Sequence, residues 1–191
     1  MKTINGFQGE YRWLSNFWPC TIVYNENVFS TVEHAYQSAK VEDLLLKEKI
    51  KNCATPPEAK DYFQKNNIAV ADNWTGQKKL SVMKELLWLK FGGREPLLTQ
   101  ALLLTEDAEI IEDNTWEDRF WGVCNGIGDN HLGKLIMQIR SELLLQKEKI
   151  LFRVSGNVAN RDIADLLMMD ERQLYEKMIA FKIKNAEWWI S

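Results

Sequence analysis

The pattern of the sequence changes at residue 30. Residues 1–30 are rich in aromatic, β-branched and turn-forming residues, and two β-prone segments, 21–24 and 28–29, flank the turn-like residues 25–27. This arrangement is typical of a β-hairpin. After residue 30 the apolar residues recur mostly at helical spacing. We therefore predict an α+β fold that is predominantly helical and carries a small β hairpin or sheet near its N-terminal end.

Capping residues, prolines and glycines mark the expected helix boundaries. Residues 30–33 (Ser-Thr-Val-Glu) form a capping-box pattern that opens a helix, Pro56 and Pro57 suit the first turn of another, and Gly92-Gly93 ends a third. Helices are expected at about 30–50, from 55 onward, from about 75 to 91, at 96–104 and at 131–147, with a short strand at 109–112.

A chain of 191 residues has room for one full-sized domain and a small addition. Residues 148–191 differ in character from the rest, with a basic turn followed by expected helices at 160–169 and after 170. We therefore assign residues 1–147 to the main domain. Residues 148–191 are assigned to a helical extension that docks on this domain or on a second copy, and the sequence leaves the oligomeric state open.

Charge and cysteine content exclude several classes of protein. The 24 basic and 27 acidic residues give a net charge of −3, which provides no overall attraction to long nucleic acids or anionic membranes. Because no apolar run spans a bilayer and no secretory signal is visible, we expect a cytoplasmic protein without membrane association. Three cysteines without C-x-x-C spacing favour reduced thiols. With only two histidines, we expect neither a metal site nor a cofactor.

One expected helix face carries four hydrogen-bonding or reactive groups. Glu33, Tyr36, Gln37 and Lys40 lie at i, i+3, i+4 and i+7, which places a carboxylate, a phenol, an amide and an amine on one side. Such a face is either a solvated surface or an active site, and Glu33 also suits the last position of the capping box. The spacing alone leaves these alternatives open.

An irregular stretch from residue 114 to 130 contains two tryptophans and three glycines. Loops of this length inside a compact domain are usually functional. Its glycines next to a helix start, Gly128 among them, can present backbone N–H groups to an anion, and Arg140 on the following helix can reach a phosphate. Equally, the glycines simply turn the chain and Arg140 forms a salt bridge.

The eight tryptophans allow two interpretations, because aromatic side chains either pack in the hydrophobic core or line a site as flat walls for a flat ligand. We assign Trp74, at a loop-to-helix junction, to a stacking wall and Trp121 to the border of the same site. The role of Trp116 stays open. The tryptophans expected in the framework are Trp13, Trp18 and Trp88.

Several short phrases, in this order, resemble the NADAR family. They are residues 14–17 (Leu-Ser-Asn-Phe), 31–40 (Thr-Val-Glu-His-Ala-Tyr-Gln-Ser-Ala-Lys), Asn73-Trp74, Lys90-Phe91, Trp121-Gly122, and 128–133 (Gly-Asp-Asn-His-Leu-Gly) continuing to Arg140. The resemblance covers about residues 5–147 and implies a single YbiA-like catalytic domain. The extension at 148–191 lies outside the resemblance.

The resemblance implies an N-glycosidase, a hydrolase that cleaves the bond between ribose C1 and a base nitrogen. Some members are associated with phosphorylated riboflavin-pathway intermediates and others with removal of ADP-ribose from guanine in nucleic acid. The implied substrate is a small phosphorylated N-riboside or an ADP-ribosyl compound, with ADP-ribosylated nucleic acid included. The matching functional positions are Glu33, Lys40, Trp74 and Asp118, and the matching pocket positions are Asn16, Tyr36, Gln37, Gly128, Asn130 and Arg140.

The residue types suit this chemistry, because cleavage builds positive charge at C1 and negative charge on the departing base. Our hypothesis makes Lys40 a nucleophile that forms a Schiff base with the ring-opened sugar, and Glu33 an acid/base catalyst or a stabiliser of the oxocarbenium ion. Asp118 orients the ribose hydroxyls or shares the proton transfers. The remaining roles are base stacking for Trp74 and phosphate binding for residues 126–133 with Arg140.

Two positions depart from or complicate the family pattern. Residues 116–120 read W-E-D-R-F, so Glu117 and Asp118 compete for the same place in the site. We choose Asp118 because it lies three residues before Trp121, as in the family. Val41 stands where many relatives carry an aromatic residue, which changes the expected pocket shape.

Two other classes of function compete with the hydrolase. One is a module that binds ADP-ribose or an NAD-related nucleotide without cleaving it. The other is a structural protein that uses residues 148–191 as its interface. The co-occurrence of Glu33, Lys40 and Asp118 favours catalysis, because a binding module needs neither the amine nor both acids.

Overall fold

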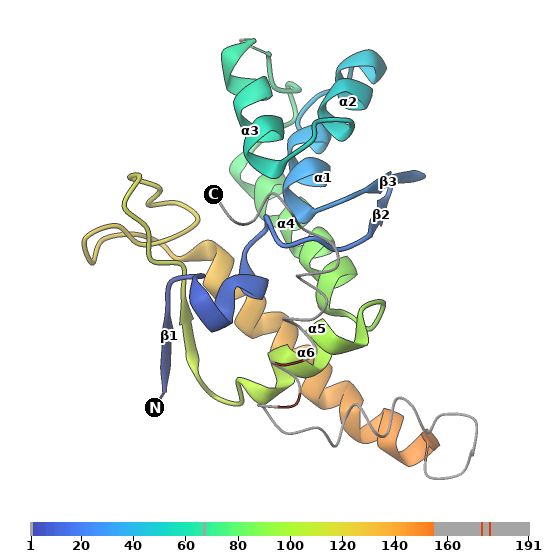
Figure 1. Ribbon diagram of the computed structural model, residues 1–191, viewed down its shortest axis with the longest axis vertical. Coiled ribbons are helices and arrows are strands. Elements are labelled where there is room, and N and C mark those ends of the chain that lie inside the picture. The colour runs from blue at the N-terminus through green and yellow to red at the C-terminus, as the bar shows by residue number, and fades with distance from the viewer. Residues whose placement is uncertain (1, 67, 155–172, 174–175, 177–191) are drawn as a thin grey trace.

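Helices and two small sheets make up the part of the chain that the computed structural model describes, residues 2–66 and 68–154 together with residues 173 and 176 (Figure 1). In chain order the elements are β1 (Thr3–Asn5), the 3-10 helix η1 (Gly9–Leu14), β2 (Ile22–Tyr24), β3 (Asn27–Phe29), α1 (Val32–Ala39), α2 (Leu44–Lys51), α3 (Pro56–Lys65), α4 (Gly76–Phe91), α5 (Pro96–Leu104), β4 (Glu109–Ile111) and α6 (His131–Val154). The predicted α+β fold, predominantly helical, is confirmed.

The predicted N-terminal hairpin is present. β2 pairs antiparallel with β3, and Ile22 lies opposite Phe29. The residues between the strands, Asn25 and Glu26, have φ values of 47° and 63°. Two left-handed residues in succession give a turn whose twist matches that of the strands. Ile22 and Phe29 are both buried, so the hairpin packs one face on the core.

The second sheet joins distant parts of the chain. β1 runs parallel to β4, with Ile4 opposite Ile110, and both side chains are buried. The strand predicted at 109–112 is therefore confirmed, whereas β1 is too short to show a pattern in the sequence. Beyond β4 the chain enters the irregular loop 112–130, drawn in olive and yellow in Figure 1.

The prediction of one continuous helix at 30–50 is wrong, because two helices occupy this stretch. α1 ends at Ala39 and α2 begins at Leu44. Asp43 starts the second helix, since its carboxylate accepts the backbone N–H groups of Leu45 and Leu46 at 2.8 and 3.0 Å. An acceptor at this place satisfies N–H groups that the first turn of a helix leaves without partners.

The other helices predicted up to residue 147 are confirmed, with one difference in length, whereas those predicted at 160–169 and after 170 lie, apart from residues 173 and 176, outside the described residues. α3, α4 and α5 lie where they are expected, and Gly92 caps the end of α4. α6 begins at His131 but continues to Val154, past the predicted end at Lys147. The boundary that we placed after residue 147 therefore falls inside a helix. Apart from residues 173 and 176, the extension beyond residue 154 lies outside the described residues.

The core lies mainly between α4 and α6, which pack on each other. Leu86, Leu87 and Phe91 of α4 and Ile136 and Ile139 of α6 are fully buried. The tryptophans predicted for the framework lie in this core or against it, Trp13, Trp18 and Trp88. No helix within the described ranges is both long and apolar enough to cross a lipid bilayer.

Candidate active site

A cavity of about 490 Å³ opens beside α1, where the turn after η1, the end of β4 and the loop 112–130 meet. A volume of this size suits a small organic ligand. Seven of the side chains that the sequence assigns to the site line this cavity, Asn16, Glu33, Tyr36, Gln37, Lys40, Asp118 and Trp121. The structure therefore brings together residues separated by about a hundred positions in the chain.

Three residues of the polar face of α1 are buried, Glu33, Tyr36 and Gln37, and Lys40 at the end of the helix is half-buried, which decides between the solvated surface and the pocket. Thr31 caps the helix by accepting the backbone N–H of His34 at 3.2 Å. Glu33, expected to close a capping box, instead has its carboxylate in the cavity and is only 7% exposed. There Gln37 donates from Nε2 to Glu33 Oε1 at 2.6 Å. The helix thus presents this carboxylate to the interior and not to its own backbone.

The pKa values of Glu33 and Lys40 both shift toward the neutral form. Burial raises the pKa of Glu33, opposed by the Gln37 hydrogen bond and by the charges of Lys40 and Lys60. Burial lowers the pKa of Lys40 to about 8, and its Nζ lies 4.9 Å from the ring centre of Tyr36. At neutral pH about a tenth of Lys40 is therefore an uncharged amine, the form that attacks a carbonyl carbon.

Asp118 faces the cavity because its backbone is held on both sides. Asn114 accepts from the backbone N–H of Asp118 and donates to its carbonyl, at 3.1 and 2.8 Å. The carboxylate itself accepts the backbone N–H of Trp121 at 2.9 Å. The competing residue, Glu117, pairs with Arg119 at 2.7 Å and does not line the cavity. The geometry thus agrees with the choice of Asp118 for this position.

Trp74 does not line the cavity, in contrast to the predicted stacking role. It is buried behind Tyr36, with ring centres 5.5 Å apart, and so supports the wall without forming its surface. Tyr36 also packs edge-on against Trp121 at 5.6 Å. The exposed aromatic surface of the cavity comes instead from Trp116, which is 58% exposed, together with Phe17.

Three residues that the sequence assigns to the pocket, Gly128, Asn130 and Arg140, do not line the cavity. They instead hold parts of the backbone together. Asn130 donates to the carbonyl of Ile110 at 2.9 Å and accepts from the backbone of Glu112, which fixes the loop on β4. A Cβ at Gly128 would collide with the backbone carbonyl of residue 122. Arg140 is buried and donates to Thr105 at 2.7 Å. The sequence pattern does not separate the two roles, because close backbone packing and anion binding both require glycine, and phosphate binding by these residues stays a prediction.

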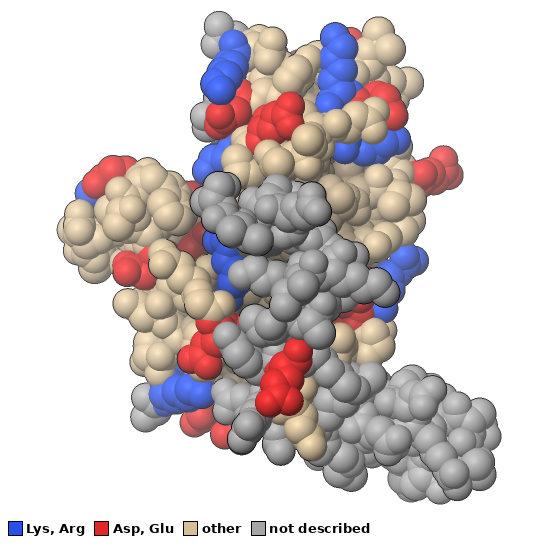
Figure 2. Space-filling view, in the orientation of Figure 1, with Lys and Arg blue, Asp and Glu red and all other residues tan. Residues whose placement is uncertain are grey.

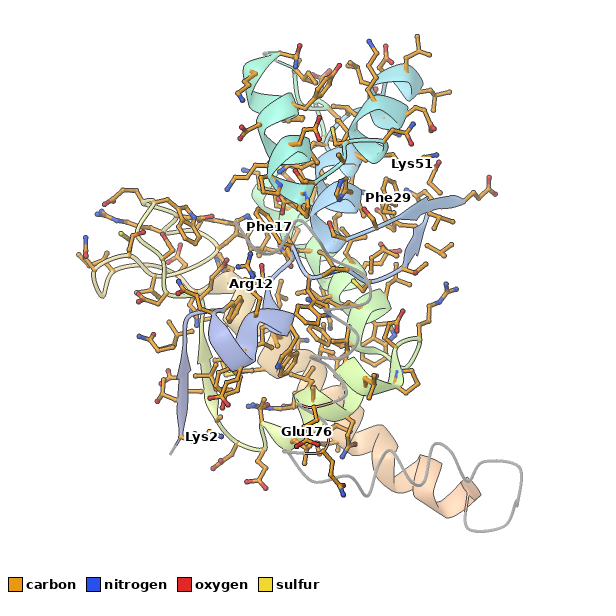
Figure 3. All side chains as sticks on the ribbon, viewed as in Figure 1. Lys2, Arg12, Phe17, Phe29, Lys51 and Glu176 are labelled. Atoms are coloured by element: carbon orange, nitrogen blue, oxygen red, sulfur yellow. The ribbon has the colours of Figure 1, made fainter. Side chains whose placement is uncertain are left out.

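Four charged residues that sequence reasoning missed also line the cavity, namely Arg12, Lys60, Glu112 and Asp113. Arg12 and Phe17 are labelled in Figure 3, where they lie near the middle of the molecule. Burial, together with the charges of Asp118 and Glu33, raises the pKa of Glu112 to about 8. The available signal was the position of Glu112 immediately after β4, since polar residues at strand ends often enter sites.

Three buried oxygen atoms in these walls find no hydrogen-bond partner within the described part of the chain. They are Asn16 Oδ1, Gln37 Oε1 and Glu112 Oε2. Buried polar atoms without a partner are uncommon and mark places where a ligand supplies one. Over the described residues, no three histidine, cysteine or acidic side chains are grouped to bind a metal ion. Acidic and basic side chains alternate over the visible described surface and form no broad basic face (Figure 2).

An amine and several acids enclosed in one small cavity of an α+β domain define a candidate enzyme site. The family model of the NADAR domain matches residues 5–144. The chain belongs to the NADAR domain family.

Named relatives and one solved structure agree with this assignment. The chain is 32% identical over 139 residues to N-glycosidase YbiA of Shigella flexneri serotype 5b, covering 72% of this chain and 85% of that protein. It is 33% identical over 131 residues to a riboflavin biosynthesis protein of Vibrio vulnificus, covering 68% of this chain but only 35% of that protein. The NMR structure of YbiA from E. coli matches with a TM-score of 0.66 and 29% identity, covering 76% and 87% of the two chains.

Proposed function

We propose that this chain is an N-glycosidase that hydrolyses the bond between ribose C1 and a base nitrogen in a phosphorylated ribosyl or ADP-ribosyl compound. The observation that carries the proposal is the enclosure of Glu33, Lys40 and Asp118 in one cavity. Relatives at about a third identity are named N-glycosidase and riboflavin biosynthesis protein, which supports the reaction class.

Glu33 and Asp118 stabilise different parts of the sugar. Positive charge grows at C1 as the bond to the base breaks, and an ionised carboxylate beside C1 stabilises that charge. We assign this role to Glu33: burial raises its pKa, and the hydrogen bond from Gln37 and the charges of Lys40 and Lys60 oppose that effect by favouring the ionised form. Asp118 accepts hydrogen bonds from the ribose hydroxyls, since its backbone is fixed by Asn114 and one carboxylate oxygen remains for the ligand.

Lys40 is the nucleophile of this proposal. Its free amine attacks C1 of the ring-opened sugar, the bond from C1 to the base breaks, and a Schiff base joins Lys40 to the sugar. Water then adds to C1, releasing the sugar and returning the amine. The lowered pKa of Lys40 supports this role, because burial holds a fraction of the amine uncharged at neutral pH.

The remaining walls fit the phosphate and the base. Arg12 and Lys60 are basic groups of the cavity, and a guanidinium binds phosphate with two parallel hydrogen bonds. Trp116 offers an exposed ring on which a flat base can stack. The unpartnered oxygens of Asn16 and Gln37 accept hydrogen bonds from N–H or O–H groups of the ligand. This arrangement replaces the predicted roles of Trp74 and Arg140.

A side-by-side assay tests the substrate class. Wild-type protein is incubated with ribosylaminopyrimidine phosphates and, separately, with DNA that carries ADP-ribose on guanine, and released base or sugar is measured by chromatography. Release from either substrate, lost in Glu33→Gln, supports the proposal and selects the substrate. Tight binding without release from either substrate would instead support a nucleotide-binding module.

A further inference from the structure

Glu112 is an acid of the cavity with an unusual environment. It directly follows β4, and its backbone is fixed on both sides, since its N–H donates to Asn130 and its carbonyl accepts from Val123 at 3.0 and 2.8 Å. Its side chain lines the cavity, and its Oε2 is buried with no hydrogen-bond partner among the described residues. An ionised carboxylate with an unsatisfied buried oxygen is costly, whereas a protonated one has a hydrogen to donate.

The charges that surround Glu112 also favour its protonated form. The negative charges of Asp118 from the loop and Glu33 from α1 add to the effect of burial, and Lys60 from α3 opposes them. Arg12 from η1 and the neighbouring Asp113 line the same cavity. Burial and the charges of Asp118 and Glu33, opposed by Lys60, set the pKa of Glu112 at about 8, so at neutral pH the residue is a carboxylic acid.

Glu33 differs from Glu112 in its partners. Glu33 receives a hydrogen bond of 2.6 Å from Gln37 and interacts with the charges of both Lys40 and Lys60. Hydrogen-bond donors and cations favour the ionised form of a carboxyl group. Burial raises the pKa of both carboxyl groups, but Gln37 supplies a donor to Glu33, whereas Oε2 of Glu112 has no donor among the described residues. Two acids of one site with such different partners are typical of a division between a charge stabiliser and a proton donor.

We propose that Glu112 is the general acid that protonates the departing base, a role that rests on the proposed N-glycosidase function. As the bond from C1 to nitrogen breaks, its electron pair goes to the base and the proton of Glu112 goes to the base with it. The water that later adds to C1 gives its hydroxyl to the sugar and its remaining proton back to Glu112. The acid is thereby regenerated in each cycle.

The first experiment detects the proton directly and needs no substrate. Infrared difference spectra of the full chain, titrated from about pH 5 to 10, are expected to show a carboxylic-acid carbonyl band that is lost near pH 8. The band is absent in Glu112→Gln and present in Glu109→Gln, a matched change of an exposed acid on β4, the strand that Glu112 follows. Loss of this band below about pH 6, or its persistence in Glu112→Gln, would overturn the proposal.

The second experiment separates proton donation from positioning. Glu112→Gln is assayed on a substrate with a neutral base, which needs a proton to leave, and on a pyridinium N-riboside phosphate, whose base leaves uncharged without one. We expect kcat on the first substrate to fall about 10²- to 10⁴-fold and on the second less than about threefold. Equal losses on both substrates show a structural role and contradict the proposal.

A conservative variant distinguishes loss of the carboxylic acid from loss of structure. Glu112→Asp keeps the acid but shortens the side chain, so it should retain part of the activity on the neutral base that Glu112→Gln loses. Equal activity of the two variants on that base contradicts proton donation. If the wild type releases base from neither substrate, the proposed function fails, and the infrared titration still decides whether Glu112 holds a proton.

Discussion

The polar face of α1 and the glycine-containing stretch 122–133, which joins the end of the loop to the first turn of α6, look equally functional in the sequence, but they differ in the structure. The face of α1 directs Glu33, Gln37 and Lys40 into the cavity. The glycines of this stretch allow backbone segments to pack closely. A Cβ at Gly133, in the first turn of α6, would collide with the carbonyl of Ile110. Similar family motifs thus supply reactive groups in one region and close packing in the other.

This difference predicts two separable kinds of variant. Substitutions on the face of α1 remove chemistry and leave the fold, because the cavity already provides the space around those side chains. Substitutions at the close contacts of the loop weaken the fold before they affect any chemical step. Loss of stability without loss of chemistry in the variants of α1, or loss of chemistry at full stability in the glycine variants, would contradict this difference.

The largest effect is expected for Lys40→Ala. We expect kcat for base release to fall by about 10³-fold or more, because the nucleophile is removed. The melting temperature should stay the same or rise, since the buried amine costs desolvation. Chromatographic assay and thermal unfolding measure the two quantities. Full activity in this variant would end the nucleophile proposal and leave direct attack by water.

Gly133→Ala should act on stability. The added Cβ meets the carbonyl of Ile110 and the side chain of Asn130, so the free energy of unfolding should fall by about 1–3 kcal/mol. Chemical denaturation measures this loss, and activity per folded molecule should change little. Gly76→Ala, where nothing lies within 4 Å of the new Cβ, is the matched control and should be neutral. Equal stability of the two variants would contradict the framework role of the loop.

Arg12 and Arg140 test where phosphate binds. Arg12→Ala should raise KM for a phosphorylated substrate about tenfold, with a much smaller change for the dephosphorylated compound. Arg140→Ala should leave both KM values unchanged and lower stability, because Arg140 is bonded to Thr105 inside the protein. The reverse outcome would return phosphate binding to the region that the sequence suggested.

The smallest effect is expected in the pH dependence of kcat/KM. The reactive form of Lys40 is the free amine, which increases as the pH rises through about 8. The reactive form of Glu112 is the acid, which is lost as the pH rises through about 8. The profile should therefore be a narrow bell centred near pH 8 and about threefold lower one unit away on either side. A flat alkaline limb in the wild type would exclude Glu112 as the acid.

Local signals in the sequence predicted much of the fold. The hairpin, most helices and the shared face of Glu33 and Lys40 follow from caps, turns and periodicity. The break at residues 40–43 was missed because the pattern of α1 continues into α2, and only the capping carboxylate of Asp43 marks the new start. The pairing of β1 with β4 was missed because it joins short strands about a hundred residues apart.

Spacing alone predicted the part of the candidate site that one helix carries, and the resemblance to the NADAR family added Asn16 and Asp118. Glu33, Tyr36 and Lys40 share a face by spacing alone. Arg12 and Glu112 enter the same cavity from η1 and from the end of β4, which depends on tertiary packing that no local pattern encodes. Burial, which sets the ionisation of these groups, is likewise a property of the folded chain.

Trapping with borohydride detects the covalent bond that we propose between Lys40 and the sugar. Wild-type protein is mixed with the substrate that it cleaves, borohydride reduces the Schiff base to a stable amine, and peptide mass spectrometry locates the sugar adduct. We expect an adduct on Lys40, with Lys60 in the same cavity unmodified, and no adduct in Lys40→Ala. Base release at the full wild-type rate without any adduct, or with the adduct on Lys60, would contradict this proposal.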